Sequence, residues 1–118
     1  MNNLYTVLSA TSLMGDDVKN RAGEDLGSIE ELMLDVENGR IAYAVLSFGG
    51  VLGLGDKLFA IPWPALTLNT DEKCFYLNVD KESLKEAPGF DKDNWPNMAN
   101  NQWRTDLYNH YAVEPYWT

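Results

Sequence analysis

Residues 26–48 read LGSIEELMLDVENGRIAYAVLSF, and this stretch decides the fold. Residues 26–35 are a predicted strand, and its apolar positions slip phase near Glu30 and Glu31, which predicts a β-bulge. Residues 37–40 place Asn38-Gly39 between two apolar runs, a strong hairpin signal because both residue types tolerate positive φ. Residues 41–48 are the returning strand and are apolar almost throughout, so we expect both of its faces to be covered.

Short strands follow this hairpin at regular spacing, over residues 57–61, 65–68 and 74–79. Strands of this length without long intervening helices predict a small antiparallel barrel or sandwich. Asp80 is a suitable cap for a short helix over residues 81–87, which Pro88-Gly89 ends. A second helix is predicted over residues 102–111, with Trp103, Leu107 and Tyr111 on one face.

The stretch from residue 13 to residue 79 resembles the PRC-barrel family, a β-barrel module of the photosynthetic reaction-centre H subunit and of a ribosome maturation factor. The resemblance is carried by LMG at 13–15, GEDLGSIEELMLD at 23–35, GRIAYAVLSFGG at 39–50 and LFAIPW at 58–63. The tail, with PGFDKDNWP at 88–96, is similar to small stand-alone bacterial members. The resemblance implies a small antiparallel β-barrel over residues 1–80, with a helical, aromatic-rich C-terminal extension over residues 81–118 packed on it. It implies no catalytic residue, since the family shares no catalytic motif.

Charge and cysteine content limit the classes of partner and compartment. The net charge is −9, with 9 Lys and Arg against 18 Asp and Glu. Direct binding of nucleic acid or of an anionic membrane surface is disfavoured, because both depend on clustered basic residues. The single cysteine, Cys74, excludes an intrachain disulfide. Neither a signal peptide nor a membrane-spanning segment is predicted, so we expect a cytoplasmic protein.

The glycine-rich segment 50–55 has the spacing of a phosphate loop, but Asp56 stands where a lysine is required. The interpretation that remains is a structural loop carrying Val51, Leu52 and Leu54. Three aliphatic side chains on a short loop favour contact with a partner, and a second copy is the simplest partner. The candidate interface residues are Phe48, Val51, Leu52, Leu54, Trp63, Trp95 and Trp103.

Other constellations give weak signals, and we predict no catalytic, cofactor-binding or metal-ligating residue. Residues 91–102 begin like a calcium loop, but Trp95 and Gln102 break its pattern. Cys74 and His110 are the only residues of their types, and the sequence interpretation is a strand thiol and a surface histidine. The best candidate acid–base carboxyls are Glu24 and Asp25, in the turn before the first long strand.

Half of the chain's aromatic residues lie after Gly89, so the tail must bury some of them. Internal packing is favoured over stacking on a sugar or a flat ligand. The leading hypothesis is a non-enzymatic protein-interaction module that forms a homodimer. The alternatives are a small-molecule or metal-binding enzyme domain, and an adapter for a ribosomal or membrane complex by analogy with relatives of the family.

Overall fold

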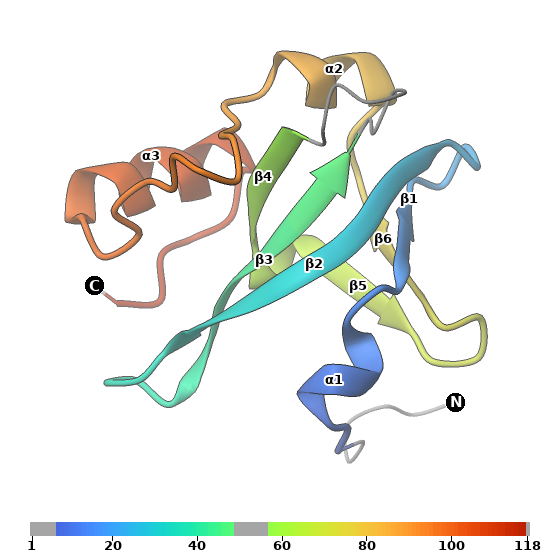
Figure 1. The fold of residues 1–118 in the computed structure, drawn as a ribbon, viewed down its shortest axis with the longest axis horizontal. Helices are drawn as coiled ribbons and strands as arrows, with labels where there is room; N and C mark the ends of the chain where they lie inside the picture. The colour runs from blue at the N-terminus through green and yellow to red at the C-terminus, as the bar shows by residue number, and fades with distance from the viewer. Residues whose placement is uncertain (1–6, 49–56, 118) are drawn as a thin grey trace.

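The computed structural model describes residues 7–48 and 57–117. These residues form one curled sheet with short helices around it (Figure 1). The strands are β1 (Asp17–Lys19), β2 (Asp25–Asp35), β3 (Arg40–Phe48), β4 (Lys57–Pro62), β5 (Leu66–Asn69) and β6 (Cys74–Leu77). The helices are α1 (Ala10–Leu13), α2 (Lys81–Glu86) and α3 (Asn101–His110), with a 3₁₀ turn, η1 (Trp63–Ala65).

The six strands lie in the order β4-β3-β2-β1-β6-β5. Neighbours pair antiparallel except β1 and β6, which are parallel, so the sheet is mixed and forms a half-barrel. The predicted mainly β, barrel-like fold is confirmed, with this one departure from antiparallel pairing. β1 went unpredicted because it has only three residues and therefore no periodicity.

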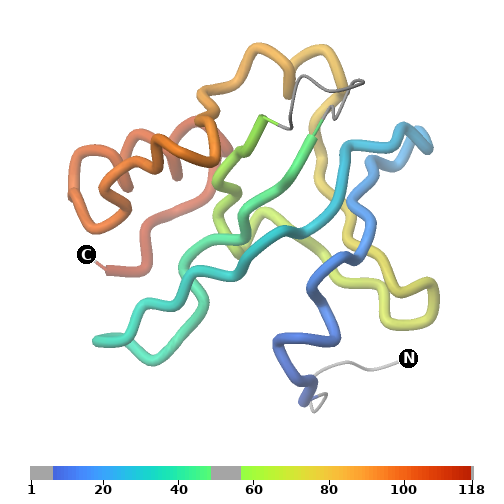
Figure 2. Tube along the Cα trace, viewed as in Figure 1, coloured from blue at the N-terminus to red at the C-terminus, as the bar shows by residue number. Residues whose placement is uncertain are grey.

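The hairpin of β2 and β3 is the longest feature of the sheet, and its tip projects from one end of the molecule (Figure 2). The pairing skips Glu30, between Ile29 and Glu31, which confirms the predicted bulge. The turn has four residues, and of Asn38 and Gly39 only Gly39 takes a positive φ, of 65°. The Asp35 carboxylate organises this turn by accepting hydrogen bonds from Asn38 N–H and Asn38 Nδ2.

Both faces of β3 are covered, as its apolar sequence predicts, and residues 42–48 are all buried. One face meets the main core inside the curl of the sheet. That core includes Val18, Leu26, Ile29, Leu46, Phe59, Ile61, Phe75, Leu77 and Leu84. The other face meets the C-terminal residues, where Ala42, Tyr43 and Ala60 form a second cluster with Leu107 and Tyr108.

Capping side chains fix the starts of the two later helices. Asp80 accepts a 2.7 Å hydrogen bond from Ser83 N–H at the start of α2, as predicted. Asn100 accepts from Trp103 N–H at 2.9 Å at the start of α3. β5 starts at Leu66 rather than residue 65 because η1 precedes it, and β6 ends at Leu77 rather than residue 79.

Candidate functional site

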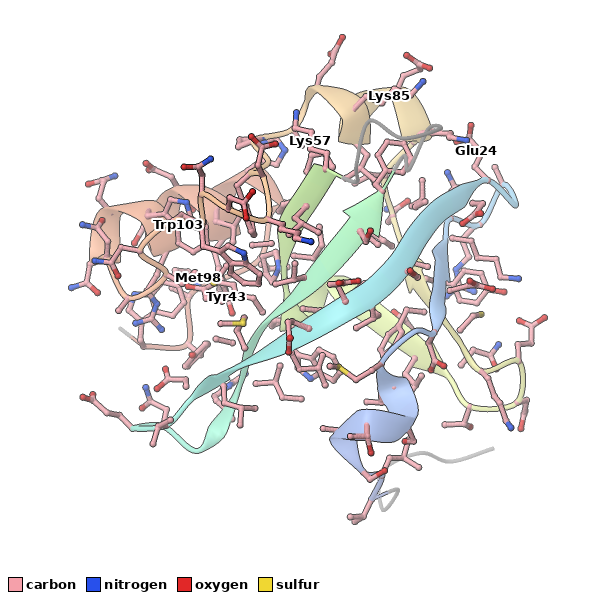
Figure 3. All side chains as sticks on the ribbon, in the orientation of Figure 1. Glu24, Tyr43, Lys57, Lys85, Met98 and Trp103 are labelled. Carbon is pink, nitrogen blue, oxygen red and sulfur yellow. The ribbon has the colours of Figure 1, made fainter. Side chains whose placement is uncertain are left out.

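The C-terminal residues pack on the outer face of β3 through aromatic side chains. Tyr108 is fully buried, and its hydroxyl donates to the Ala42 carbonyl at 2.9 Å. Trp103 meets Tyr43 edge to face, with ring centroids 5.4 Å apart. Figure 3 shows Tyr43, Met98 and Trp103 together between the hairpin and α3. The predicted shared face of Trp103, Leu107 and Tyr111 is confirmed, since all three belong to this cluster.

A polar cluster joins the tip of the hairpin to this packed tail. Asp35 Oδ2 accepts hydrogen bonds from Tyr116 OH at 2.6 Å and from Arg104 Nη2 at 3.3 Å. Arg104 Nε donates to Tyr43 OH at 3.2 Å, and Tyr43 OH donates to the Met98 carbonyl at 3.3 Å. The Asp35 and Arg104 side chains are only 12% and 14% exposed, so this ion pair is largely shielded from water.

Electrostatics keep this cluster charged and hydrogen-bonded at neutral pH. The hydrogen bond from Tyr116, followed by those from Asn38, holds the pKa of Asp35 well below its ordinary value. Burial, followed by the hydrogen bond to Asp35, raises the pKa of Tyr116 to about 12. The Arg40 guanidinium lies over the Tyr116 ring, 3.9 Å from its centroid, and Arg104 lies over Trp117 at the same distance.

A groove of about 460 Å³ lies between the end of the hairpin and the segment that leads into α3. Its lining is mainly apolar and also includes Asp35, Tyr43 and Arg104 of the polar cluster. The apolar lining includes Met33, Leu34, Val36, Ala42, Met98 and Ala99.

Two aliphatic side chains of this lining are largely open to solvent. Leu34 is 66% exposed and Val36 is 87% exposed. They flank Asp35, which is held by the polar cluster, so the backbone that carries them is fixed. Neighbouring exposed aliphatics beside an apolar groove are the kind of surface that a partner covers.

The candidate interface residues predicted from the sequence fall into two separate places. Phe48 is 9% exposed against Phe59, and Trp63 packs edge to face on Phe75 at 5.7 Å. Trp103 lies on Tyr43, while Trp95 is 40% exposed beside Phe90. Val51, Leu52 and Leu54 lie outside the described residues.

The candidate acid–base carboxylates, Glu24 and Asp25, both accept hydrogen bonds from backbone N–H groups. Glu24 Oε1 accepts from Asn20 Nδ2 at 2.8 Å and from Lys81 N–H at 3.1 Å, and these bonds lower its pKa. A general acid at neutral pH needs a raised pKa, so Glu24 is unsuited to that role. Asp25 accepts from Gly27 N–H at 3.0 Å.

Cys74 is buried at the start of β6, and His110 is exposed at the end of α3. Among residues 7–48 and 57–117, no three His, Cys, Asp or Glu side chains cluster as metal ligands would. None of the helices described is long and apolar enough to cross a membrane.

Sequence reasoning missed Leu34, Val36, Arg104 and Tyr116. One signal was present: Asp35, three residues before Asn38 and four before Gly39, has the spacing of a side chain that caps a turn. The alternation around Asp35 also leaves Leu34 and Val36 as apolar neighbours at a hairpin tip, where burial is difficult. Nothing in the local pattern indicates that Arg104 and Tyr116 reach Asp35.

Comparison with known proteins agrees with the fold. A search of curated proteins finds no match to this chain. The family model of the PRC-barrel domain matches residues 6–84, which is more than half of the chain and includes all six strands. This chain therefore belongs to the PRC-barrel domain family.

Proposed function

We propose that this protein is a non-enzymatic interaction module that binds a partner protein at the end of the β2–β3 hairpin. The observation that carries the proposal is the exposure of Leu34 and Val36, at 66% and 87%, beside the groove. Covering a Leu or Val side chain fully is worth about 1.5–3 kcal/mol, so a partner that buries both gains substantial free energy.

The rigidity of the hairpin end supports the same proposal. Asp35 lies between the two exposed aliphatics and is bonded to Tyr116, Arg104 and Asn38. These bonds tie the hairpin to α3 and to the C-terminal segment, so the groove is formed before a partner arrives. Binding to a formed surface loses less conformational entropy than binding to a flexible one.

The charged side chains near the groove also fit binding better than catalysis. Asp35 is held ionised by its hydrogen bonds and is neutralised by Arg104. Because proton transfer at neutral pH requires a group whose pKa lies near 7, a carboxyl with a strongly lowered pKa is a poor proton donor.

Homodimer formation is a second part of this proposal. Phe48 and Lys57 pair at the end of β3 that lies farthest from the hairpin turn, and the connection between them, residues 49–56, lies outside the described residues. That connection carries Val51, Leu52 and Leu54 between glycines. We propose that self-association uses this end, which leaves the hairpin end available to a different partner.

Affinity capture from the native cell tests the docking role. The bait is the full chain, compared with the double variant Leu34→Thr, Val36→Thr, which places a β-branched, strand-compatible threonine at both positions and removes apolar surface. Val7→Thr is the matched control, because Val7 is 92% exposed on the segment before α1. Partners that bind the unchanged chain and the control but not the double variant support the proposal. Identical captures by all three would exclude the hairpin end as the docking surface.

Light scattering during gel filtration tests the homodimer separately. We expect the mass of two chains at tens of micromolar, about the range of a weak protein–protein affinity. The double hairpin variant should keep that mass. A single-chain mass at this concentration would exclude the dimer and leave the docking role standing.

A further inference from the structure

We propose that the hairpin groove binds a cationic–apolar segment of a partner protein, with an apolar side chain in the groove and a Lys or Arg beside Glu37. This inference rests on the proposed function and specifies the chemistry of the partner. The juxtaposition behind it is a mainly apolar groove whose lining includes the exposed, unpaired carboxylate of Glu37.

The walls of the groove are suited to an apolar side chain. Met33 comes from β2, Ala42 from β3, and Met98 and Ala99 from the segment before α3. Methionine side chains are flexible and polarisable, so the walls can adapt to aliphatic groups of different shape. Leu34 and Val36 belong to the lining but are largely exposed, so a segment of chain can cover more of their apolar surface than an isolated small molecule can.

The charged side chains that line the groove differ in whether they are paired. Asp35 is neutralised by Arg104 at 3.3 Å, so that pair presents little net charge to an occupant. Glu37 is exposed and has no ion-pair partner among residues 7–48 and 57–117. A basic side chain of the occupant can therefore approach Glu37 without displacing an existing partner.

The same charges disfavour a second copy of this chain as the occupant. A twofold contact centred on the hairpin would bring the same patch of both copies together, including both Glu37 side chains. A basic segment avoids this penalty and is attracted by the net charge of −9.

Peptide binding to the full chain tests the inference. The probes are three short fluorescein-labelled peptides: one alternating Leu and Lys, one alternating Leu and Glu, and one alternating Ser and Lys. Fluorescence anisotropy should show binding of the Leu–Lys peptide alone at concentrations up to about 1 mM. The Leu34→Thr, Val36→Thr variant should weaken this binding about tenfold or more, because buried aliphatic surface is lost. Val7→Thr should leave it unchanged.

A pair of charge reversals separates local from global electrostatics. Glu37→Lys and Glu86→Lys change the net charge equally, but Glu86 is exposed on α2, away from the groove. We expect Glu37→Lys to weaken binding of the Leu–Lys peptide at least about fivefold more than Glu86→Lys does. Both reversals reduce the overall negative charge, but only Glu37→Lys also removes a local charge contact. Equal effects of the two reversals would overturn the assignment of the cation to Glu37.

Two further outcomes would overturn the inference in different ways. Equal binding of the Leu–Glu peptide, or no binding of the Leu–Lys peptide, would exclude a cationic–apolar occupant. A dimer that dissociates in the Leu34→Thr, Val36→Thr variant would identify the occupant as a second copy. Partners captured from the cell through the hairpin despite a failed peptide test would leave the interaction role intact and reject only the partner chemistry proposed here.

Discussion

Tyr116 and Asp35 lie 81 positions apart in the chain, yet the Tyr116 hydroxyl donates a 2.6 Å hydrogen bond to Asp35 Oδ2. This contact fastens the C-terminal segment to the turn of the hairpin. It also positions the residue that lies between Leu34 and Val36, so the tail of the chain helps to shape the candidate binding surface.

Replacing Tyr116 with Phe removes this hydrogen bond and keeps the ring. We expect Tm to fall by about 3–6 °C, because a hydrogen bond to a charged acceptor is lost from a largely buried cluster. Differential scanning calorimetry measures the change. Tyr76→Phe is the matched control, since Tyr76 OH donates at 2.7 Å to the Glu72 carboxylate at an exposed site four residues away. If Tm falls as much in Tyr76→Phe as in Tyr116→Phe, the contact with Asp35 has no special role in stability.

The Asp35 carboxylate predicts a dependence of stability on acid pH. Its pKa is lowered in the folded chain, so the unfolded chain takes up more protons as the pH falls below the ordinary value of about 4. The stability that Asp35 contributes is therefore complete at neutral pH and decreases from about pH 4–5 downwards. Urea unfolding between neutral pH and about pH 3 should show a smaller loss in Asp35→Asn than in the unchanged chain. Parallel pH profiles of the two proteins would contradict this expectation.

Adding one methyl group at Gly27 should destabilise the fold strongly. Its φ is 122°, and a Cβ at this position would overlap the Ser47 carbonyl oxygen of the adjacent strand. We expect Gly27→Ala to destabilise the fold by about 3 kcal/mol or more, measured by urea unfolding. Gly23→Ala is the control, because Gly23 has φ 87° but open space around it, and it should cost only about 1 kcal/mol. Equal losses would show that backbone conformation alone, and not the close strand approach, sets the penalty.

Asn20 and Asn69 make similar hydrogen bonds but differ in burial, so we expect their substitutions to differ in the loss of stability. Asn20 is 6% exposed; its Oδ1 accepts from Ala22 and Glu24 N–H, and its Nδ2 donates to Glu24 and to the Val79 carbonyl. Asn69 makes the corresponding turn bonds to Asp71 and Glu72 at a more exposed site. Asn20→Ala should cost about 2–3 kcal/mol, because four partly buried hydrogen bonds of a buried side chain are lost.

The matched substitution Asn69→Ala should cost less than about 1 kcal/mol, since water replaces the lost bonds. Urea unfolding of both variants measures the two losses. The reverse order of losses would contradict the argument from burial.

Local patterns predicted much of the fold. Asn38-Gly39 and the apolar run of residues 41–48 indicated the hairpin and its buried second strand, and the phase slip at Glu30 indicated the bulge. Asp80 indicated the start of α2, and the spacing of Trp103, Leu107 and Tyr111 indicated the inward face of α3. In each case the signal lies within a few residues of the element that it predicts.

The candidate site was harder to predict because its contacts join distant parts of the chain. Arg104 is one of nine basic residues and Asp35 one of eighteen acidic residues, and nothing in their spacing pairs them across 69 positions. The exposure of Leu34 and Val36 depends on how far the hairpin extends beyond the rest of the sheet. The resemblance to the family indicated a barrel but did not locate this surface.

The parallel pairing of β1 with β6 joins an early and a late segment of the chain, so it can form only after most of the chain has been synthesised. Val18 of β1 pairs with Phe75 of β6, and both are buried in the main core. A growing chain that ends before Cys74 contains β1 but lacks β6. The β1 edge that pairs with β6 therefore stays open until most of the protein has left the ribosome. Closure of the core is therefore a late event in synthesis, and chains truncated before Leu77 should be targets for proteases.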